Sequence, residues 1–237
     1  MMKLSTPNIA ETCPEKDIYN KLLKLDNKAI LELGCGTADI TRAIATDGSA
    51  RQITALEVDE IQHQRHLLID DLPNVEFIKA GAEAVPCPDH AFDIVMMFKS
   101  LHHVPLDQME RALLEIQRVL KPGGIAYISE PVFAGDFNEL LKMFHDEEEV
   151  RLAAFSAVRQ AVDTGLLSLD QQYFFNAPML FENFAAFEQL ILKVTHTDHS
   201  LSEELFEQVR ERFESHMNQD GANFQMPIRI DLLRKSA

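Results

Sequence analysis

The sequence has few cysteines and few basic residues, and it has no long hydrophobic run. Its three cysteines, Cys13, Cys35 and Cys87, are widely spaced and form no C-x-x-C pair, which predicts free thiols in a reducing compartment. No apolar stretch approaches the ~18 residues that cross a membrane, and residues 1–14 lack the apolar segment of a signal peptide. We therefore expect a cytoplasmic protein that has no membrane partner.

Acidic residues greatly outnumber basic ones. The chain carries 22 Lys and Arg against 38 Asp and Glu, a formal net charge of -16. Such a protein is repelled by phosphate backbones unless a local basic patch intervenes, and the basic residues here are scattered singly. We therefore expect a small-molecule partner and no nucleic acid. With 237 residues, 46% of them hydrophobic, the chain is long enough for one domain with a substantial core.

A glycine-containing turn follows the first apolar run. This run is residues 29–33. Gly34 and Gly36 follow it with one residue between them, and a helical pattern starts near Ala38. This order predicts a strand, a tight turn and a helix, in which glycine lets the backbone approach a nucleotide closely. A dinucleotide site prefers a third glycine, where this chain has Asp39. A negative charge near the pyrophosphate disfavours NAD or FAD.

The order of apolar patterns predicts an α/β protein. Near-continuous apolar strands are expected at residues 29–33, 52–58, 75–79, 92–98 and 125–129. Helices are expected at residues 15–26, from residue 38, at 60–69 and at 107–120, where Asp107 and Glu110 have the spacing of a capping box. Strands that alternate with helices favour a parallel sheet covered on both faces.

The second half of the chain has a different pattern. We expect helices over residues 136–164, a mixed phenylalanine-rich stretch at 165–186, a strand at 189–195, a helix opened by the capping box Ser200 to Glu203, and a last strand at 224–233. The predicted fold is Rossmann-like, a seven-stranded mostly parallel sheet with helices on both faces and a helical lid after strand five. Residues 1–237 then form a single domain, with a core at 28–130, a lid at about 136–186, and closing strands and a helix at about 187–237.

Four motifs in order resemble the class I S-adenosylmethionine-dependent methyltransferases. Residues 32–38 fit the form E-x-G-x-G-x-A of motif I, and Glu57 closes the second strand. Residues 80–93 are similar to the family stretch G-D-A-E-x-L-P-x-P-D-x-x-F-D, with Gly81 in place of the aspartate. Residues 98–104 contain L-H-H, and residues 118–124 match R-x-L-K-P-G-G. The resemblance covers residues 28–130 and is strongest to the small-molecule, methyltransferase type 11-like branch.

This resemblance implies S-adenosylmethionine as cofactor and S-adenosylhomocysteine as product. Glu57 would accept hydrogen bonds from the ribose hydroxyls. The backbone N–H of Ala82 would meet adenine, and the contact of the family's aspartate would come from Glu83 or a backbone carbonyl. The full set of cofactor-binding residues implied is Glu32, Gly34, Cys35, Gly36, Glu57, Val58, Gly81, Ala82, Glu83, Phe98 and Lys99.

Methyl transfer is an in-line displacement, so the protein mainly holds the nucleophile and the methyl group in line, and a base removes a proton from a hydroxyl or amine acceptor. The candidate catalytic residues are His102, His103 and Glu130, with His145 and Tyr173 as further candidates for the base. Either histidine could instead have a structural role in capping or packing.

Acceptor-binding candidates also lie outside the histidine pair. The set is Lys99, His103, Arg151 and Tyr173. A lysine beside a sulfonium is unfavourable, so Lys99 would face an anionic acceptor or extend to solvent. No metal ligand is expected.

The predicted function is methyl transfer to the O, N or C atom of a small-molecule acceptor by a monomer or homodimer. The alternative is a non-catalytic methyltransferase-fold protein that binds or regulates a partner.

Overall fold

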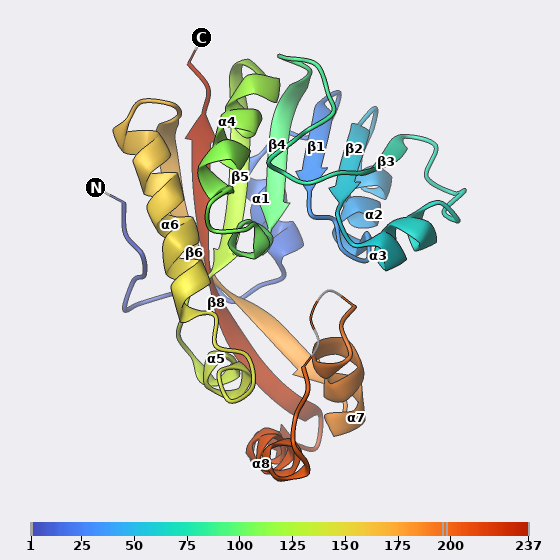
Figure 1. Cartoon of the computed structure of the whole chain (residues 1–237), viewed down its shortest axis with the longest axis vertical. Helices are drawn as coiled ribbons and strands as arrows, with labels where there is room; N and C mark the ends of the chain where they lie inside the picture. Colours follow the sequence, from blue (N-terminus) through green and yellow to red (C-terminus); the bar gives the residue numbers. More distant parts are fainter. Residues whose placement is uncertain (1, 196, 198, 237) are drawn as a thin grey trace.

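An eight-stranded sheet forms the centre of the protein (Figure 1). The computed structural model describes residues 2–195, 197 and 199–236. The strands are β1 (Ala29–Leu33), β2 (Gln52–Glu57), β3 (Val75–Lys79), β4 (Phe92–Phe98), β5 (Leu120–Pro131), β6 (Ser168–Phe181), β7 (Met217–Asn218) and β8 (Gly221–Arg234). Their order is β3-β2-β1-β4-β5-β8-β6, with β7 paired to β8. Strands β1 to β5 are parallel and β8 is antiparallel to both neighbours, which confirms the predicted Rossmann-like class.

Helices cover both faces of the sheet (Figure 1). They are α1 (Glu15–Leu22), α2 (Asp39–Thr46), α3 (Glu60–His66), the 3-10 helix η1 (Leu101–His103), α4 (Met109–Val119), α5 (Asp136–Leu141), α6 (Glu148–Asp163), α7 (Phe184–Phe187), the π-helix η2 (Glu188–Leu192) and α8 (Glu203–Glu214). None of the helices among the described residues is long and apolar enough to cross a membrane.

Alternate residues of the central strands enter two separate cores. Leu31 of β1 packs in one cluster with α4 and α6, and its neighbour Ile30 packs in the other with α1 and α2. Because successive strand residues point to opposite faces, a strand buried on both sides needs an apolar residue at almost every position. This requirement explains why β1 and β4 have near-continuous apolar sequences.

A third core lies beyond the carboxyl ends of the parallel strands. Strands β6 and β8 extend past β5 to a small unit with α5, α7 and α8 (Figure 1). This unit is packed around phenylalanines 137, 181, 184, 187, 213 and 224. Of the phenylalanines in the mixed stretch, Phe181 and Phe184 therefore serve packing of this unit, and Phe175 packs in the second core.

The predictions for the second half of the chain need three corrections. Residues 189–195, expected as a strand, begin within the π-helix η2, because η2 continues directly from α7 and buries Leu192 in the third core, which also contains Phe187 of α7. Residues 168–181, expected within a helical lid, form edge strand β6, where Pro178 is tolerated. Helix α6 packs with α4 on the main core. The role of the other segments near the carboxyl ends as a lid stays a prediction.

The two predicted capping boxes are also wrong in detail. Helix α4 begins at Met109 after Gln108, so Asp107 precedes the cap position, and no side chain caps the helix. In α8 the cap is Ser202, whose hydroxyl accepts a hydrogen bond from the Leu205 N–H at 3.2 Å.

Candidate functional site

The turn after β1 depends on its two glycines. Both have positive φ, +75° at Gly34 and +54° at Gly36, which favours glycine. A β-carbon at Gly34 would lie 2.7 Å from Cβ of Ser100, whereas one at Gly36 would meet no atom within 4 Å. Gly34 therefore allows the turn to pack against the loop after β4, and Gly36 borders open space at the carboxyl edge of the sheet.

Glu57 holds this turn from the end of β2. One carboxylate oxygen accepts the Gly36 N–H at 2.6 Å, and the other accepts the N–H groups of Val58 and Asp59 at 2.8 and 2.9 Å. A carboxylate has about four lone-pair sites, so the buried Glu57 side chain keeps capacity for a ribose hydroxyl. The side chain of Val58 is exposed beside it.

His66, the last residue of α3, contacts this turn, and sequence reasoning missed it. Its Nε2 donates a hydrogen bond to the Gly36 carbonyl at 2.8 Å, and its ring stacks on Phe77 at 4.7 Å between centroids. Burial lowers the pKa of His66, which favours a neutral ring that keeps one donor. His66 lies at the end of a mostly polar helix, where the sequence gives no sign of a contact to the turn.

Thr195 connects the segment after η2 to the start of α3. Its hydroxyl bonds the Asp59 carboxylate, and Gln62 donates to it at 2.9 Å. Asp59 also caps α3 by accepting the Ile61 N–H at 2.8 Å. The C-terminal unit thus contacts the chain just two residues after Glu57, and no sequence pattern predicted this link.

Glu32 is buried beneath the turn. Its carboxyl accepts a hydrogen bond from the Thr41 hydroxyl at 2.7 Å, and burial raises the pKa of Glu32 to about 8. Cys35 is also buried, and burial raises the pKa of its thiol. Both side chains therefore face the interior, and the backbone of residues 34–36 forms the surface of the turn.

The loop after β3 contains Gly81, Ala82 and Glu83. Its Ala80 N–H bonds the Glu57 carbonyl at 3.2 Å, so the loop starts beside the acidic end of β2. A β-carbon built at Gly81 would overlap the carboxylate of Glu83. Glu83 therefore puts an acid into the space where a side chain at position 81 would lie.

Phe98 ends β4 and Lys99 follows it, and the two side chains have different surroundings. Phe98 packs in the core against Tyr19 and Tyr127, so only its backbone borders the site. Lys99 has a positive φ of 54°, and its ammonium pairs with Glu15 of α1 at 2.9 Å. The expected anionic partner of Lys99 is thus supplied by the protein itself.

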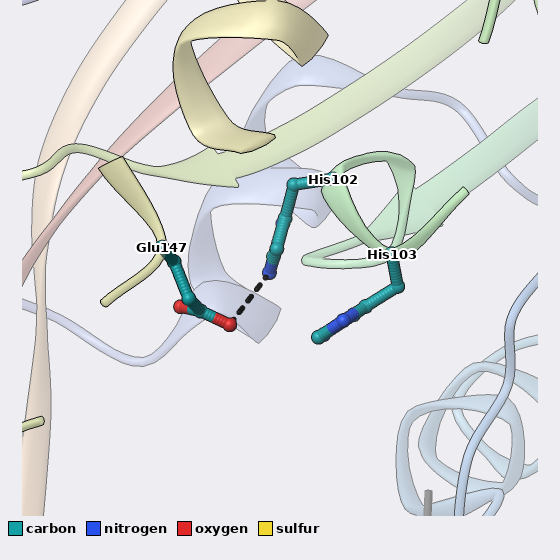
Figure 2. A group of neighbouring side chains, drawn as sticks. All are labelled: His102, His103 and Glu147. Atoms are coloured by element: carbon teal, nitrogen blue, oxygen red, sulfur yellow. Dashed lines mark ion pairs between the residues drawn. The ribbon is translucent and has the colours of Figure 1, made fainter. Parts of the chain in front are cut away.

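A buried acid–histidine network follows β4. Nδ1 of His102 lies 2.5 Å from one Glu130 oxygen, and the other Glu130 oxygen accepts the Leu101 N–H at 2.9 Å. The opposite ring nitrogen faces Glu147 at 3.6 Å (Figure 2). Burial opposes charging, but the two carboxylates outweigh it and raise the pKa of His102 to about 9. His102 is therefore an imidazolium at neutral pH, which cannot accept a proton.

Glu147 connects this network to α6. One carboxylate oxygen accepts Nε and Nη2 of Arg151 at 3.1 and 2.5 Å, and Arg151 also donates to Asn138. The other oxygen lies 3.1 Å from Nε2 of His145. Although burial opposes ionisation, His102 and Arg151 keep the pKa of Glu147 well below its usual range. Arg151, a predicted acceptor ligand, is thus committed to Glu147.

A cavity of about 280 Å³ opens over this network. Its polar lining comprises Lys99, His102, His103, His145, Glu147, Arg151, Thr197 and His199, and its apolar lining includes Pro131, Phe137, Leu141, Met179, Ile191 and Met226. The structure therefore brings His103, Lys99 and Arg151 together here. It does not bring Tyr173, whose hydroxyl bonds Lys21 and Glu11 elsewhere on the sheet.

Known proteins match both the sequence motifs and the fold. Residues 30–124 match the family described as Methyltransferase domain. The ubiquinone/menaquinone biosynthesis C-methyltransferase UbiE of Hahella chejuensis is 32% identical over 123 residues, 50% of this chain and 48% of that protein. The UbiE of Ectopseudomonas mendocina is 34% identical over 122 residues, 49% and 46% of the two chains. The chain spans about half the length of these curated relatives.

Solved structures are similar over most of the chain. The BH2331 protein of Bacillus halodurans C-125 has a TM-score of 0.63 at 17% identity and covers 94% of this chain and 98% of its own. The [4+2]-cyclase SpnF has a TM-score of 0.61 at 22% identity, with 94% and 81% covered. At these identities the likeness concerns the fold. The family match and the curated relatives make the segment around residues 30–124 similar to the class I S-adenosylmethionine-dependent methyltransferases, whose cofactor is S-adenosylmethionine.

Proposed function

We propose that the protein transfers a methyl group from S-adenosylmethionine to a small-molecule acceptor. The observation that carries this proposal is the arrangement of the Gly36 turn and Glu57 at the same sheet edge as the 280 Å³ cavity. Ligands of open α/β sheets bind at the carboxyl ends of the strands. A cofactor on this turn would have its ribose at Glu57 and its methionine end toward the loop after β4.

The cavity lining favours an acceptor with an apolar body and a polar reacting end. Apolar side chains such as Phe137, Met179 and Ile191 form one part of the lining, and His102, His103 and Glu147 form the other. The curated relatives are named for C-methylation in ubiquinone and menaquinone biosynthesis. We therefore place phenols and quinols first among the acceptors to test, with methylation at oxygen or at a ring carbon.

His103 is the proposed acceptor of the substrate proton. His102 is already protonated at neutral pH, since the pKa of its ring is raised to about 9. Both oxygens of the buried Glu130 carboxylate are engaged by His102 and Leu101. His103 is exposed in the cavity, with its ring 4.1 Å from that of His102. His102 and Glu130 would therefore position η1 rather than exchange protons with the acceptor.

We also propose a cytoplasmic protein that has no nucleic acid partner. Cys13, Cys35 and Cys87 are all unpaired in the structure, which fits a reducing, cytoplasmic environment. The net charge of -16 disfavours a nucleic acid partner. A monomer or homodimer stays the prediction for the assembly.

An assay with labelled cofactor tests the proposal. Protein would be incubated with S-adenosylmethionine carrying a labelled methyl group and a panel of phenols and quinols, and label in the organic products would be counted. We expect transfer to at least one acceptor, lost in Glu57→Ala and kept in His63→Ala, a control on α3. A protein that binds cofactor but transfers nothing across the panel would favour the non-catalytic alternative.

A further inference from the structure

His102, His103, His145 and Glu147 lie close together in the lining of the cavity. His102 and His103 come from η1, and His145 and Glu147 come from the loop between α5 and α6. The ligating atoms of His102, His103 and Glu147 all lie within 4.8 Å of one another. Figure 2 shows His102 directed at Glu147 with the ring of His103 alongside. Two segments far apart in sequence thus place imidazole and carboxylate donors around one point.

The spacing of these donors fits an ion between them. Nε2 of His102 and Oε1 of Glu147 are 3.6 Å apart, beyond the ordinary range of a hydrogen bond. Two ligands of a tetrahedral ion with bonds of ~2.0–2.2 Å lie ~3.3–3.6 Å apart. The third ligand, His103, is an exposed side chain of a short helix, and its ligand nitrogen lies within 4.8 Å of the other two ligand atoms.

Outer partners already orient both buried ligands. His102 uses Nδ1 to bond Glu130 at 2.5 Å, which directs Nε2 into the cluster. Metal-ligating histidines usually have such a carboxylate on the second nitrogen. Arg151 donates a hydrogen bond to Oε2 of Glu147 at 2.5 Å. The other oxygen, Oε1, faces His102 and His145. Metal sites in proteins commonly have this arrangement, in which hydrogen bonds from neighbouring residues orient the side chains that bind the ion.

We propose that His102, His103 and Glu147 bind a divalent first-row transition ion of the Zn²⁺ type. Two imidazoles and one carboxylate are donors typical of such ions. The ion would replace the proton on Nε2 of His102. His145, whose Nε2 lies 3.1 Å from the same oxygen of Glu147, also lines the cavity, and a remaining coordination position of the ion could take an oxygen, nitrogen or sulfur atom of a ligand.

The role of the ion in methyl transfer rests on the proposed function, whereas its binding does not. A hydroxyl bound to a divalent ion has a lowered pKa and would release its proton to water. A lone pair of the acceptor would then form the bond to the methyl carbon, as the carbon–sulfur bond of the sulfonium breaks and its electrons pass to sulfur. With the ion in place, His103 would be a ligand and the ion would replace it in activating the acceptor.

Titration with metal alone tests the site. Chelator-treated, dialysed protein would be titrated with Zn²⁺ by calorimetry and with Co²⁺ by visible absorption, because Co²⁺ bound to nitrogen and oxygen ligands gives ligand-field bands. We expect one ion per chain. His103→Ala and Glu147→Gln should each weaken binding at least ~10–100-fold, while His63→Ala on α3 should bind like the unchanged protein.

The metal affinities of the variants can be compared only if each variant is shown to be folded. Glu147→Gln disturbs the buried partner of Arg151, so its circular dichroism and melting are recorded, and the exposed His103→Ala carries the test if Glu147→Gln does not fold. No saturable ion, or equal affinity in His103→Ala and the unchanged protein, would overturn the inference. S-adenosylhomocysteine binding is measured in the same samples: cofactor binding without metal binding rejects the metal site alone, and metal binding without cofactor binding rejects the proposed function alone.

Discussion

The carboxylate of Glu83 covers Gly81 and fills the space that a side chain at position 81 would occupy. In the family pattern an aspartate at the position of Gly81 contacts adenine. The loop therefore contains an acid in nearly the same place, contributed from two residues further along the chain. We predict that Glu83 supplies the adenine contact that the family pattern assigns to this aspartate.

If Glu83 replaces that aspartate, its loss should be repaired by restoring the aspartate. We expect Glu83→Ala to weaken S-adenosylhomocysteine binding ~10–100-fold, the scale of a hydrogen bond to a charged group. Gly81→Asp alone should also weaken binding, because two carboxylates would compete for one space. The double variant should recover most of the affinity, a strongly non-additive result measurable by calorimetry. Additive losses would mean that adenine is held elsewhere.

Glu57 should contribute both to cofactor affinity and to the stability of the turn. Glu57→Ala removes the acceptor of three backbone N–H groups and of the expected ribose hydroxyls. We expect S-adenosylhomocysteine affinity to fall by about 1–3 kcal/mol, measured by calorimetry on folded protein. Glu60→Ala, a neighbouring exposed acid on α3, serves as control, and affinity unchanged in Glu57→Ala would remove Glu57 from the site.

Glu32 should make the protein less stable as the pH rises. The pKa of Glu32 is near 4.5 unfolded and about 8 folded, because burial disfavours its charge. Its contribution to stability is therefore complete below pH 4.5 and is lost as the pH rises toward 8. Glu32→Gln stays neutral and still accepts from Thr41, so it should be more stable at pH 7 by about 1–2 kcal/mol, or about 3–6 °C in Tm. A Tm difference between the two proteins that does not grow from pH 5 to pH 8 would contradict this.

The hydrogen bonds of Thr195 to Asp59 and Gln62 should slow the association and dissociation of the cofactor. Thr195→Val keeps the shape of the side chain but loses its bonds to Asp59 and Gln62. We expect S-adenosylhomocysteine to associate and dissociate about tenfold faster in surface plasmon resonance, the scale of one or two lost hydrogen bonds. Thr197→Val, in the same segment and lining the cavity, is the matched control. Identical rates in Thr195→Val and the unchanged protein would show that the link does not limit exchange.

The first half of the fold could be predicted because its central strands are buried on both faces. The apolar runs at residues 29–33 and 92–98 match β1 and β4 residue for residue, and the short stretch at residues 75–79 matches edge strand β3. The second half could not, because β6 is a half-exposed edge strand whose sequence mixes polar, aromatic and proline residues. Residues 189–195 were apolar enough for a strand, but tertiary packing in the third core placed their first part in a π-helix.

Part of the candidate site could likewise be predicted from the sequence, and part could not. Gly34, Gly36 and Glu57 follow from local spacing, since a strand, a turn and a helix place them together. The partners of the other residues come from distant segments: Glu15 for Lys99, Glu147 for His102 and His66 for Gly36. One sequence does not reveal such pairs. Lys99 lines the cavity and also pairs with Glu15 of α1, and His102 is held between Glu130 and Glu147. Their roles toward an acceptor stay predictions.

The most direct measurement is the melting temperature with S-adenosylhomocysteine, with NAD as the comparison ligand. A ligand at 100 times its Kd stabilises the native state by ~2.7 kcal/mol, which corresponds to about 5–10 °C for a chain of this length. The account predicts this rise with S-adenosylhomocysteine, no rise with NAD, and a smaller rise in Glu57→Ala. No rise with S-adenosylhomocysteine, or a rise with NAD, would contradict the assignment of the Gly36 turn and Glu57 to a methyl-donor cofactor.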